Sequence, residues 1–519
     1  MLDLAITGGT VIDGTGAPGR RVDVGIRADR ILRVGTLDSN EARQTIDATG
    51  LVVAPGFIDV HNHSEGWLLK TSHFAPKLSQ GFTTEILMSD GISYAPVTPE
   101  NCREWFHYLR SLNGLRFEDY RGWRTIADYL ALLDGHTAQN VAALIPYANL
   151  RVIAAGWRNN TLDDTQIRIM RRMTEQAMDA GAVGISTGLD YISECFATTD
   201  ELAEVCAAMA PWLGIYVTHV RYKKGTLRGV QEAVEIGRRA GVPVHISHLK
   251  GGSPAETEQL MEYIDRVATN EVDFSFDVYP YMPGSTMLNF LLPYEVWEDG
   301  PFHVANKLLD PQVRSRLETL LAAFIPSLEQ IHLAWLSTRD NVHLQGRTLA
   351  EYVASTGKSA ADALCDLLIE ENLAGLAVVY GPEDSLIEPW LAHPKFMLGS
   401  DGVYFGDGHV HPRVYGSAPR VLGPLVRDRR LFTLEEAVRK MSGFPAERFG
   451  LVGRGKLQQG AFADVVVFNP KTIRDRATYE EPHLPSVGVE HVIVNGQPVW
   501  EQGQAAGEGR AGRALRFNV

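Results

Sequence analysis

Six side chains of metal-binding type stand at the ends of short apolar runs that lie far apart in the sequence. Histidine nitrogens and carboxylate oxygens are common ligands of zinc in proteins. In the pair His61-x-His63 the imidazoles are two residues apart, so both face the same side of a strand. If the run ends meet, four imidazoles and two carboxylates form a metal site, by ligand type a zinc site. The six residues are His61, His63, Asp90, His219, His248 and Asp401.

Each of these residues also has a simpler interpretation. Asp90 follows the apolar run 86–88 and precedes Gly91, a place where an acid commonly belongs to a turn. A single histidine in a strand is commonly structural. We expect this for His245, which stands three residues before His248 and should face away from it. The metal interpretation therefore depends on the whole set meeting on one rim.

The elements that would position these residues alternate along the middle of the chain. Segments 161–181 and 226–241 place apolar residues at helical spacing and end at glycine, as amphipathic helices do. Eight strands alternating with helices predict an α/β fold with a (β/α)8 TIM-like barrel, whose strands meet at an active site by their carboxyl ends. The predicted strands are residues 56–63, 83–91, 140–150, 182–189, 215–221, 242–250, 273–281 and 395–402.

The two ends of the chain differ from the middle. Residues 1–55 and 450–519 carry short strands separated by turn residues such as Gly-Gly and Asp-Gly, which predicts one β-sandwich domain built from both termini. The barrel is then expected to span residues 56–449. Because the stretch between the seventh and eighth predicted strands is long, residues 286–345 are predicted to be an inserted, mostly helical segment at the mouth of the barrel.

Composition narrows the class of protein. The chain has 519 residues, 45% hydrophobic and 22% charged, and its net charge of −14 argues against a nucleic-acid partner. The four cysteines have no paired spacing, which predicts neither disulfides nor a zinc knuckle. No apolar stretch approaches the about 18–20 residues of a membrane span, and the first residues lack a signal-peptide pattern. We therefore expect a cytoplasmic protein with no membrane partner, and a homo-oligomer is left open.

Several stretches of the sequence resemble the amidohydrolase superfamily, and within it the N-acyl-D-amino-acid deacylases, or D-aminoacylases. They span nearly the whole chain, and the pairs DVYPY with GST and HPR with PRVLG are specific to this subfamily. The stretches are PGFIDVHNH, QGFTTEILMSDGISYAP, GISTGLDY with FATTDEL, THVR, VHISHLK, DVYPYMPGST, LGSDG, HPRVYGSAPRVLG and GAFADVVVFNP. The resemblance implies a (β/α)8 barrel, a β-sandwich from both termini and a small insertion after strand seven.

The resemblance also implies a metal site with one departure. It implies that Asp90, His219 and His248 hold a tightly bound zinc ion, while His61 and His63 contribute a second, often weaker position. Asp90 stands where well-studied D-aminoacylases have a cysteine in the motif G-N-C-G, and the segment GISTGL offers no lysine for a carbamylated bridge. Because a carboxylate is a harder ligand than a thiolate, we expect one or two ions, weaker zinc retention and tolerance of Mn²⁺ or Co²⁺.

By this resemblance the chain is expected to be a metal-dependent hydrolase. The expected reaction cleaves the amide bond of small-molecule N-acyl-D-amino acids to a carboxylate and a free amino acid. Asp401 matches the catalytic aspartate of the family and would act as general base and then as general acid. Four further residues match positions that bind the substrate carboxylate in the family, namely Lys250, Tyr281, Ser285 and Arg413.

Two other interpretations stay open. Another amidohydrolase acting on amides, dipeptides or cyclic amides would use the same metals without needing the four carboxylate-binding residues. A barrel scaffold without catalysis would be expected to lack ligand histidines or Asp401, and all are present. The loop 190–194 is expected to shape the side-chain pocket, and its acids, Asp190 and Glu194, disfavour an acidic substrate side chain nearby.

Overall fold

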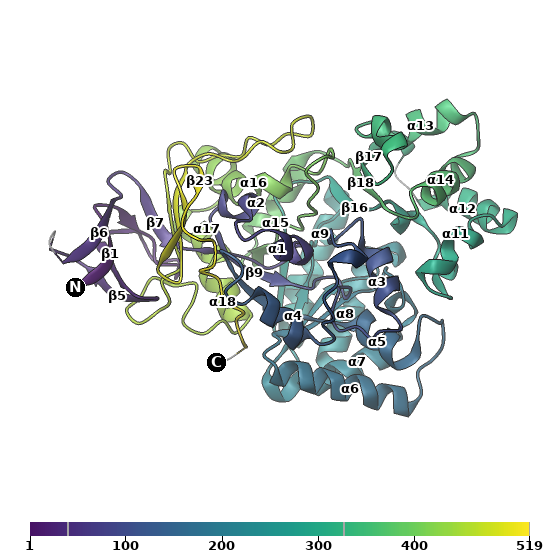
Figure 1. Cartoon of the computed structure of the whole chain (residues 1–519), viewed down its shortest axis with the longest axis horizontal. Helices are drawn as coiled ribbons and strands as arrows, with labels where there is room; N and C mark the ends of the chain where they lie inside the picture. Colours follow the sequence, from purple (N-terminus) through teal and green to yellow (C-terminus); the bar gives the residue numbers. More distant parts are fainter. Residues whose placement is uncertain (39–40, 325–326, 518–519) are drawn as a thin grey trace.

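A series of parallel strands runs through the middle of the molecule in the computed structural model, which describes residues 1–38, 41–324 and 327–517 (Figure 1). Neighbours in the series follow the order of the sequence, first β8-β9-β10 and then β11-β12-β13-β14-β15-β19. Their bounds are β8 Phe57–Asp59, β9 Phe82–Leu87, β10 Asn140–Ala143, β11 Ile145–Pro146, β12 Gly184–Gly188, β13 Ile215–His219, β14 Val244–Ile246, β15 Phe274–Val278 and β19 Phe396–Leu398.

Hydrogen bonds join the separate parts of this series. The N–H of Leu144, between β10 and β11, donates to the Leu87 carbonyl of β9 over 3.0 Å, so β10 continues into β11. Beyond β8 and β19, the N–H of Asp401 donates to the His61 carbonyl over 2.7 Å and the N–H of His63 to the Gly402 carbonyl over 3.0 Å. The first and last strands are therefore neighbours at their carboxyl ends, and the strand ends surround a common centre.

Helices connect the strands and lie outside them, which gives the α/β fold predicted from the sequence (Figure 1). Both predicted amphipathic helices are confirmed: α6 begins after the N-cap Asp163, and α8 ends at Gly241, whose φ of +69° suits a helix end. The connecting helices are α1 Glu65–Lys70, α2 Ala75–Leu78, α3 Cys102–Leu109, α4 Ile126–Leu133, α5 Tyr147–Ala155, α6 Asp164–Asp179, α7 Thr199–Cys206, α8 Thr226–Ala240, α9 Pro254–Tyr263, α10 Thr269–Glu271, α15 Glu388–Ala392, α16 Arg413–Arg420, α17 Leu434–Met441 and α18 Gly443–Arg448.

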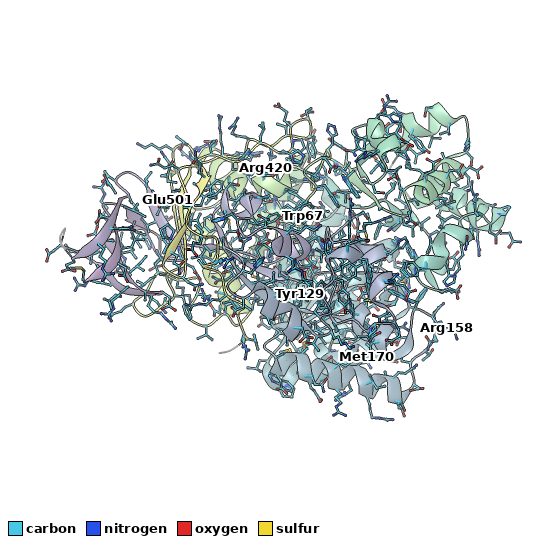
Figure 2. All side chains as sticks on the ribbon, in the orientation of Figure 1. Trp67, Tyr129, Arg158, Met170, Arg420 and Glu501 are labelled. Carbon is cyan, nitrogen blue, oxygen red and sulfur yellow. The ribbon has the colours of Figure 1, made fainter. Side chains whose placement is uncertain are left out.

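Side chains fill the space between strands and helices. Tyr129 of α4 is fully buried and donates its hydroxyl to the carbonyl of Glu65 over 2.9 Å, whereas Arg158 and Glu501 lie at the surface (Figure 2). All four cysteines are buried and free, as the sequence predicts. Among the described helices, none has the length and apolar character needed to cross a membrane.

The observed strands overlap the predicted ones but end earlier. The strand predicted over 242–250 is regular only from Val244 to Ile246, and that predicted over 83–91 ends at Leu87. The residues that follow leave the extended conformation, because Asp90, His248 and Asp401 have φ values of +56°, +39° and +47°. Asp90, His248 and Asp401 therefore lie on turns just beyond the ends of the strands.

Both ends of the chain contribute to one pair of sheets. β20 pairs antiparallel with β7, so a seven-stranded sheet contains segments from both termini. A buried apolar cluster joins the two sheets, with Ile6 and Val24 from the four-stranded sheet and Val465 and Ile493 from the seven-stranded sheet. The strands are β1 Leu2–Thr7, β4 Asp23–Arg27, β5 Arg30–Gly35 and β6 Ala42–Asp47 in one sheet, and β2 Thr10–Val11, β3 Arg20–Arg21, β7 Val52–Pro55, β20 Val465–Phe468, β21 Val489–Val494, β22 Gln497–Glu501 and β23 Gln504–Ala505 in the other.

The stretch between β15 and β19 forms a unit of its own at the far end of the molecule from the terminal sheets (Figure 1). Besides helices it holds an antiparallel sheet in the order β16-β18-β17, of which β18 lies beyond residue 345. Its elements are β16 Gly284–Met287, α11 Val304–Lys307, α12 Pro311–Phe324, β17 Ile331–Leu336, α13 Leu349–Thr356, α14 Ala360–Glu370 and β18 Gly375–Val379.

The domain limits themselves stay predictions. Residues 39–40 and 518–519 of the predicted sandwich, and 325–326 of the predicted insertion, lie outside the described residues.

The core shared by the terminal sheets gives a test of stability. We expect Ile493→Ala to lower the free energy of unfolding by about 2–5 kcal/mol, because it leaves a cavity at a fully buried side chain. Val452→Ala, at a position 56% exposed, is the matched control and should change it by less than about 0.5 kcal/mol. Denaturant unfolding measures both; equal losses in the two variants would contradict a shared core.

Candidate active site

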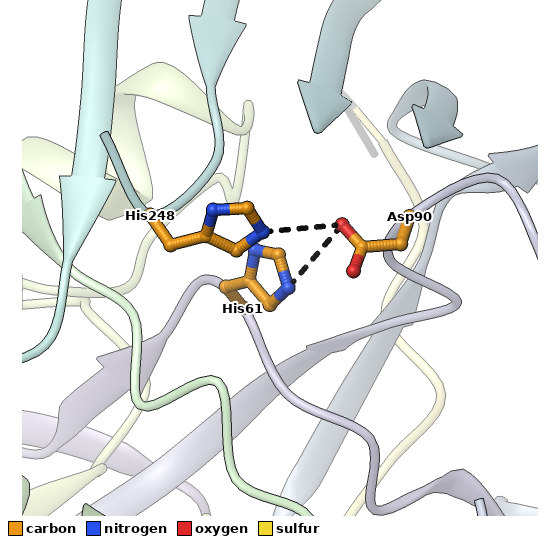
Figure 3. A group of neighbouring side chains, drawn as sticks. All are labelled: His61, Asp90 and His248. Atoms are coloured by element: carbon orange, nitrogen blue, oxygen red, sulfur yellow. Dashed lines mark ion pairs between the residues drawn. The ribbon is translucent and has the colours of Figure 1, made fainter. Parts of the chain in front are cut away.

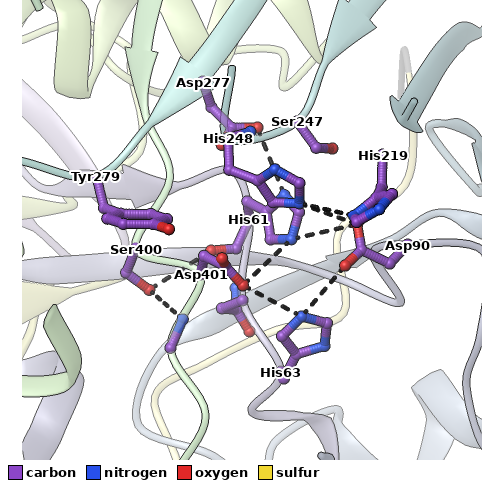
Figure 4. Close-up of polar contacts among 12 residues, drawn as sticks. His61, His63, Asp90, His219, Ser247, His248, Asp277, Tyr279, Ser400 and Asp401 are labelled. Carbon is purple, nitrogen blue, oxygen red and sulfur yellow. Dashed lines mark hydrogen bonds and ion pairs between the residues drawn. The ribbon is translucent and has the colours of Figure 1, made fainter. Parts of the chain in front are cut away.

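The strand ends bring the six predicted metal-site residues into one cluster (Figures 3 and 4). Oδ1 of Asp90 lies 3.5 Å from Nε2 of His61 and 3.8 Å from Nε2 of His248, and Oδ2 lies 3.6 Å from Nε2 of His63. Oδ1 of Asp401 lies 3.4 Å from Nε2 of His63. Nδ1 of His219 completes the cluster at 3.2 Å from Nε2 of His248. Residues from five separate strand ends therefore meet around one small volume.

Left-handed backbone turns aim three of these side chains inward. Asp90, His248 and Asp401 all have positive φ, a conformation that is uncommon for residues other than glycine. Aspartate and histidine tolerate it better than most side chains, and such residues gather at functional sites. Asp90 therefore does end its strand in a turn, but the turn directs its carboxylate into the cluster.

The donor set fits a divalent metal such as zinc. Ligand atoms about 2.1 Å from a tetrahedral zinc ion lie about 3.4 Å apart, close to the separations of the cluster. Two groups of three residues have their ligand atoms within 4.8 Å of one another, His61 with Asp90 and His248, and His61 with His63 and Asp401. Nε2 of His61 and Oδ1 of Asp90 are buried without a hydrogen-bond partner among the described residues. Buried polar atoms are rarely left in this state, and a metal ion would satisfy both.

Charges and burial within the cluster shift the pKa values of its histidines and carboxylates. Burial favours the neutral ring of His63, but Asp401 and Asp90 outweigh it and raise its pKa to about 9. The pKa of His61 is raised likewise, because Asp90 and Asp277 outweigh burial. The histidines in turn outweigh burial at Asp90 and hold its pKa well below the usual range. His248 differs, because burial lowers its pKa to about 3 and leaves the ring neutral, as a metal ligand must be.

Carboxylates behind the cluster fix the orientation of its imidazoles. Oδ2 of Asp190 lies 3.3 Å from Nε2 of His219, which leaves Nδ1 to face His248. Asp277 accepts the backbone N–H of His248 at 2.9 Å and has Oδ2 3.5 Å from Nδ1 of His61. Carboxylates that hold the second nitrogen of a ligating histidine are a recurring feature of metal sites.

Asp277 contacts three histidines, and nothing in the sequence of the predicted strand 273–281 indicates this. The third is His245, whose Nε2 lies 2.9 Å from Oδ2 of Asp277 and whose Nδ1 lies 2.8 Å from Oγ of Ser275. His245 lies outside both donor groups, in agreement with the structural role expected for it.

A fully buried ionic network lies beneath the cluster. Nζ of Lys77 bonds to Asp59 and to Oγ of Ser400 (2.9 Å) and lies 3.6 Å from Oε2 of Glu85. Asp59 also accepts the N–H of Ser400 at 2.8 Å. Burial disfavours the charge on Lys77, but Asp59 and other neighbours outweigh it and raise the pKa of the ammonium. The network therefore ties the end of β8 to the end of β19, the two segments that carry His61 and Asp401.

This network predicts a large cost for removing its cation. We expect Lys77→Met to lower the free energy of unfolding by about 3–5 kcal/mol, because it leaves Asp59 and Glu85 buried with no positive partner. Adding Asp59→Asn should recover part of the loss. Lys70→Met, whose ion pair with Asp119 lies near the surface, should cost less than about 1 kcal/mol. Denaturant unfolding of the three variants measures this, and a Lys77→Met midpoint equal to that of the unmodified chain would contradict the argument.

Two of the residues predicted to bind a carboxylate lie beside the cluster. The guanidinium of Arg413 is fully buried, with Nη1 2.8 Å from Oδ2 of Asp401, and Nη2 donates to the Ser285 carbonyl over 3.1 Å. Nζ of Lys250 donates to the Tyr279 hydroxyl at 2.7 Å, and burial together with Arg413 lowers the Lys250 pKa to about 7. The hydroxyl of Ser285 itself is bonded to the Ala377 carbonyl at 2.9 Å.

Tyr281 points elsewhere, and Tyr279 takes the position between the two cations. The hydroxyl of Tyr281 donates to Asp475 over 3.3 Å, while the ring of Tyr279 lies 4.3 Å from the Arg413 guanidinium. The chain turns directly after β15, where the N–H of Tyr281 bonds the Tyr279 carbonyl at 2.9 Å. The regular strand therefore ends here, and the hydroxyls of the two tyrosines have different partners.

The two acids of the loop after β12, Asp190 and Glu194, differ in their contacts. Asp190 bonds to His219 and to the hydroxyl of Tyr294 from the inserted stretch. Glu194 is fully buried, and neither carboxylate oxygen has a hydrogen-bond partner in the described part of the chain. Burial raises the pKa of Glu194 well above the usual range and so favours the neutral acid.

Comparison with known proteins agrees with this geometry. The model of the amidohydrolase family matches residues 44–315 and 372–500. The D-aminoacylase of Alcaligenes xylosoxydans xylosoxydans is 39% identical over 99% of this chain and 97% of its own. The structure of N-acyl-D-glutamate deacylase from Bordetella bronchiseptica, in complex with zinc and a phosphonate mimic of the tetrahedral intermediate, has a TM-score of 0.83 and 34% identity over 99% of both chains.

A D-aminoacylase described as having a binuclear metal centre, with one-metal activation and second-metal attenuation, has a TM-score of 0.82 and 35% identity over 99% of this chain and 100% of its own. Each of these matches covers almost the full length of both proteins compared. The chain therefore belongs to the amidohydrolase family, and within it to the group of D-aminoacylases and related N-acyl-D-amino-acid deacylases.

Proposed function

We propose that this chain uses a divalent metal to hydrolyse the amide bond of N-acyl-D-amino acids to a carboxylate and a free amino acid. The observation that carries the proposal is the convergence of four imidazoles and two carboxylates at the strand ends. The substrate class is supported by the D-aminoacylase at 39% identity and an N-acyl-D-glutamate deacylase at 37% identity, each matched over 99% of this chain.

Asp90, His219 and His248 are proposed to hold one zinc ion, with His61 and His63 at a second position. A bound divalent metal polarises an amide carbonyl and allows a water to ionise near neutral pH. The protein keeps the ligand rings in place through Asp190 and Asp277, whose oxygens hold the outward nitrogens of His219 and His61. Mn²⁺ and Co²⁺ are alternatives because the donors are nitrogen and oxygen only.

Asp401 is proposed to move the proton. Its Oδ1 faces His61 and His63, at 3.7 and 3.4 Å, where a water between the ligands would lie. Burial would raise the pKa of Asp401, but Arg413 outweighs it and holds the carboxylate ionised and able to accept a proton. The same carboxyl then returns the proton to the leaving amine, which makes Asp401 general base and general acid in turn.

Arg413 and Lys250 are proposed to hold the substrate carboxylate, with Ser285 and Tyr281 as further predicted contacts. Nε of Arg413 is buried and has no hydrogen-bond partner among the described residues, so the guanidinium keeps a free donor beside Asp401. A planar guanidinium suits a carboxylate. Tyr279 lies between the two cations and is a better-placed hydroxyl than Tyr281, because it already contacts Lys250.

We also infer a domain architecture that matches this site. The parallel strands, joined through Asp401–His61 and His63–Gly402 hydrogen bonds, support a closed (β/α)8 barrel over residues 56–449. The β20–β7 pairing and the shared apolar cluster support a composite β-sandwich of residues 1–55 and 450–519. The family match is interrupted between residues 315 and 372, which overlaps the predicted insertion of residues 286–345 and lies between β15 and β19.

The role of Asp401 can be tested directly. We expect Asp401→Asn to lower kcat/KM for an N-acetyl-D-amino acid by at least about 100-fold, since an amide cannot accept the proton. Metal content, measured by plasma mass spectrometry, should show whether the variant still holds metal. Asp407→Asn, a matched change in the same loop whose carboxylate contacts Trp335, should leave the rate unchanged. Full activity of Asp401→Asn would refute the assigned base.

A substrate panel separates the proposed activity from the alternative of another amide, dipeptide or cyclic-amide hydrolase. We expect turnover of N-acyl-D-amino acids and much less of their L-enantiomers, of dipeptides or of hydantoins. Neutralising the cation in Arg413→Gln should raise KM for N-acyl-D-amino acids but not KM for a substrate without a carboxylate, while kcat should change for both because Arg413 also pairs with Asp401. Hydrolysis of hydantoins or dipeptides with no turnover of any N-acyl amino acid would favour the alternative.

A further inference from the structure

A cavity of about 730 Å³ lies between helices α1 and α3 and the inserted stretch. This volume is within the range of small-molecule binding sites. The loop after α3 and the loop after β19 complete its walls. Six aromatic side chains line it, namely Trp67, Phe106, Phe117, Phe302, Trp335 and Phe405.

Several of these rings contact one another across the cavity wall. Phe405 stacks on Trp335 of the inserted stretch with ring centroids 4.0 Å apart, and Trp67 meets Phe405 edge-on at 6.1 Å. Phe302, also from the inserted stretch, is 51% exposed, and its ring centroid lies 5.2 Å from that of His107. Aromatic walls of this kind suit a ligand with a planar ring, which can pack against them.

Positive charge gathers in the same cavity, although the chain as a whole has a net charge of −14. Lys70 is paired with Asp119 at 3.1 Å, but no ion pair joins the three lining arginines to a carboxylate in the described part of the chain. Arginines without a carboxylate partner suit an anionic ligand. The lining cations are Lys70, Arg103, Arg110 and Arg116, and the lining carboxylates are Glu118 and Asp407.

Arg110 is partly buried and keeps a free donor. Its Nη2 donates to the carbonyls of Glu371 and Asn372, over 3.1 and 2.7 Å, while its Nε is buried with no hydrogen-bond partner among the described residues. Burial, and then the charge of Arg116, lower the pKa of Arg110. An anion bound here would offset the repulsion between the two guanidinium groups.

Two segments of the chain connect the cavity to the metal-site cluster. Trp67 follows His63 by four residues, and Phe405 follows Asp401 by four. Four residues span at most about 14 Å even when fully extended. An acyl chain of several carbons is therefore long enough to reach from the cluster to the cavity.

The cavity and the proposed carboxylate-binding residues lie on different sides of the cluster. Nζ of Lys250 and the guanidinium of Arg413 both lie against the ring of Tyr279, at 4.2 and 4.3 Å, just after β15. Lys250 follows β14, which stands opposite β9 in the circular order of strands, and the cavity is lined by α3, which follows β9. An N-acyl amino acid carries its carboxylate on one side of the amide and its acyl group on the other. With the amide at the cluster, the acyl group would extend towards the cavity.

We propose that this cavity receives the acyl group of the substrate, and that it selects acyl groups in which an aromatic ring carries a carboxylate. The aromatic side chains would pack against the substrate ring, and the three arginines would hold its acid. Such a substrate is acidic at both ends, with its amino-acid carboxylate at Arg413 and Lys250. This inference rests on the proposed function and deepens it by naming the class of acyl group.

Four substrates of the metal-loaded chain provide the test. All are derivatives of D-alanine, whose small side chain leaves the cavity to the acyl group. The acyl groups are acetyl, phenylbutanoyl, (para-carbamoylphenyl)butanoyl and (para-carboxyphenyl)butanoyl. The last two have nearly the same shape and differ in charge. We expect kcat/KM for the carboxyl compound to exceed that for the carbamoyl compound, and that for the acetyl compound, by at least about tenfold, because only the carboxylate forms charge-assisted bonds with arginine.

Variants of the cavity show which side chains recognise the acid and the ring. Arg110→Gln combined with Arg116→Gln should bring the carboxyl-to-carbamoyl ratio of kcat/KM close to one. Arg172→Gln, at an exposed position of α6 outside the cavity, is the matched control and should keep the ratio of the unmodified chain. Phe302→Ala should lower kcat/KM for the three aryl substrates relative to the acetyl compound.

Each contrary result overturns the proposal. A ratio near one in the unmodified chain, a ratio that survives in the double variant, or aryl substrates cleaved no faster than the acetyl compound would do so. Failure of the proposed function would look different, since none of the four substrates would be hydrolysed. Calorimetric titration with (para-carboxyphenyl)butanoate then decides. Binding that is lost in the double variant supports the cavity as the site for such acids, and absence of binding overturns it.

Discussion

The burial of several carboxylates in one place is the constraint on which the rest of the structure depends. Asp90, Asp277 and Asp401 are all at most 7% exposed, and a buried charge is tolerated only when it is paired. Arg413 pairs with Asp401, whereas the ion pairs of Asp90 and Asp277 within the described residues are with histidines. Histidine can give up its proton, so these two carboxylates hold negative charge that a metal ion can neutralise. The cluster is in this sense prepared for a cation.

Such a cluster also needs firm support, because like charges would otherwise push the strand ends apart. The contacts of Asp59 with Lys77 and Ser400 join the end of β8 to the end of β19. Asp277 holds the segment after β14 by accepting the N–H of His248. The turns with positive φ at Asp90, His248 and Asp401 are strained, so they persist only where surrounding contacts hold them in place. These supporting residues are not among the proposed metal ligands, yet they determine whether the ligand side chains come together.

The sequence predicted the parts of the site that follow from local pattern. His61, His63, His219 and Asp401 stand at the ends of apolar runs, and parallel strands gather such ends on one rim. Contacts between distant segments carry no local pattern. The pairing of β18 with β16 and β17, the contacts of Asp277 with three histidines and the pairing of Arg413 with Asp401 are of this kind. The role expected of Tyr281 comes from the family resemblance, and the turn after β15, beyond which its hydroxyl bonds to Asp475, has no local sequence pattern either.

Under the roles proposed for Arg413 and Asp401, their ion pair would link substrate recognition to proton transfer. The guanidinium lowers the pKa of Asp401, which keeps the carboxylate ionised but makes it a weaker base. Any carboxylate that binds Arg413 shares its positive charge and so relieves part of this effect. A substrate with a correctly placed carboxylate would therefore strengthen the base that acts on it, while a ligand without one would not. Specificity for N-acyl amino acids would then reside partly in the rate of the proton transfer, and not only in binding.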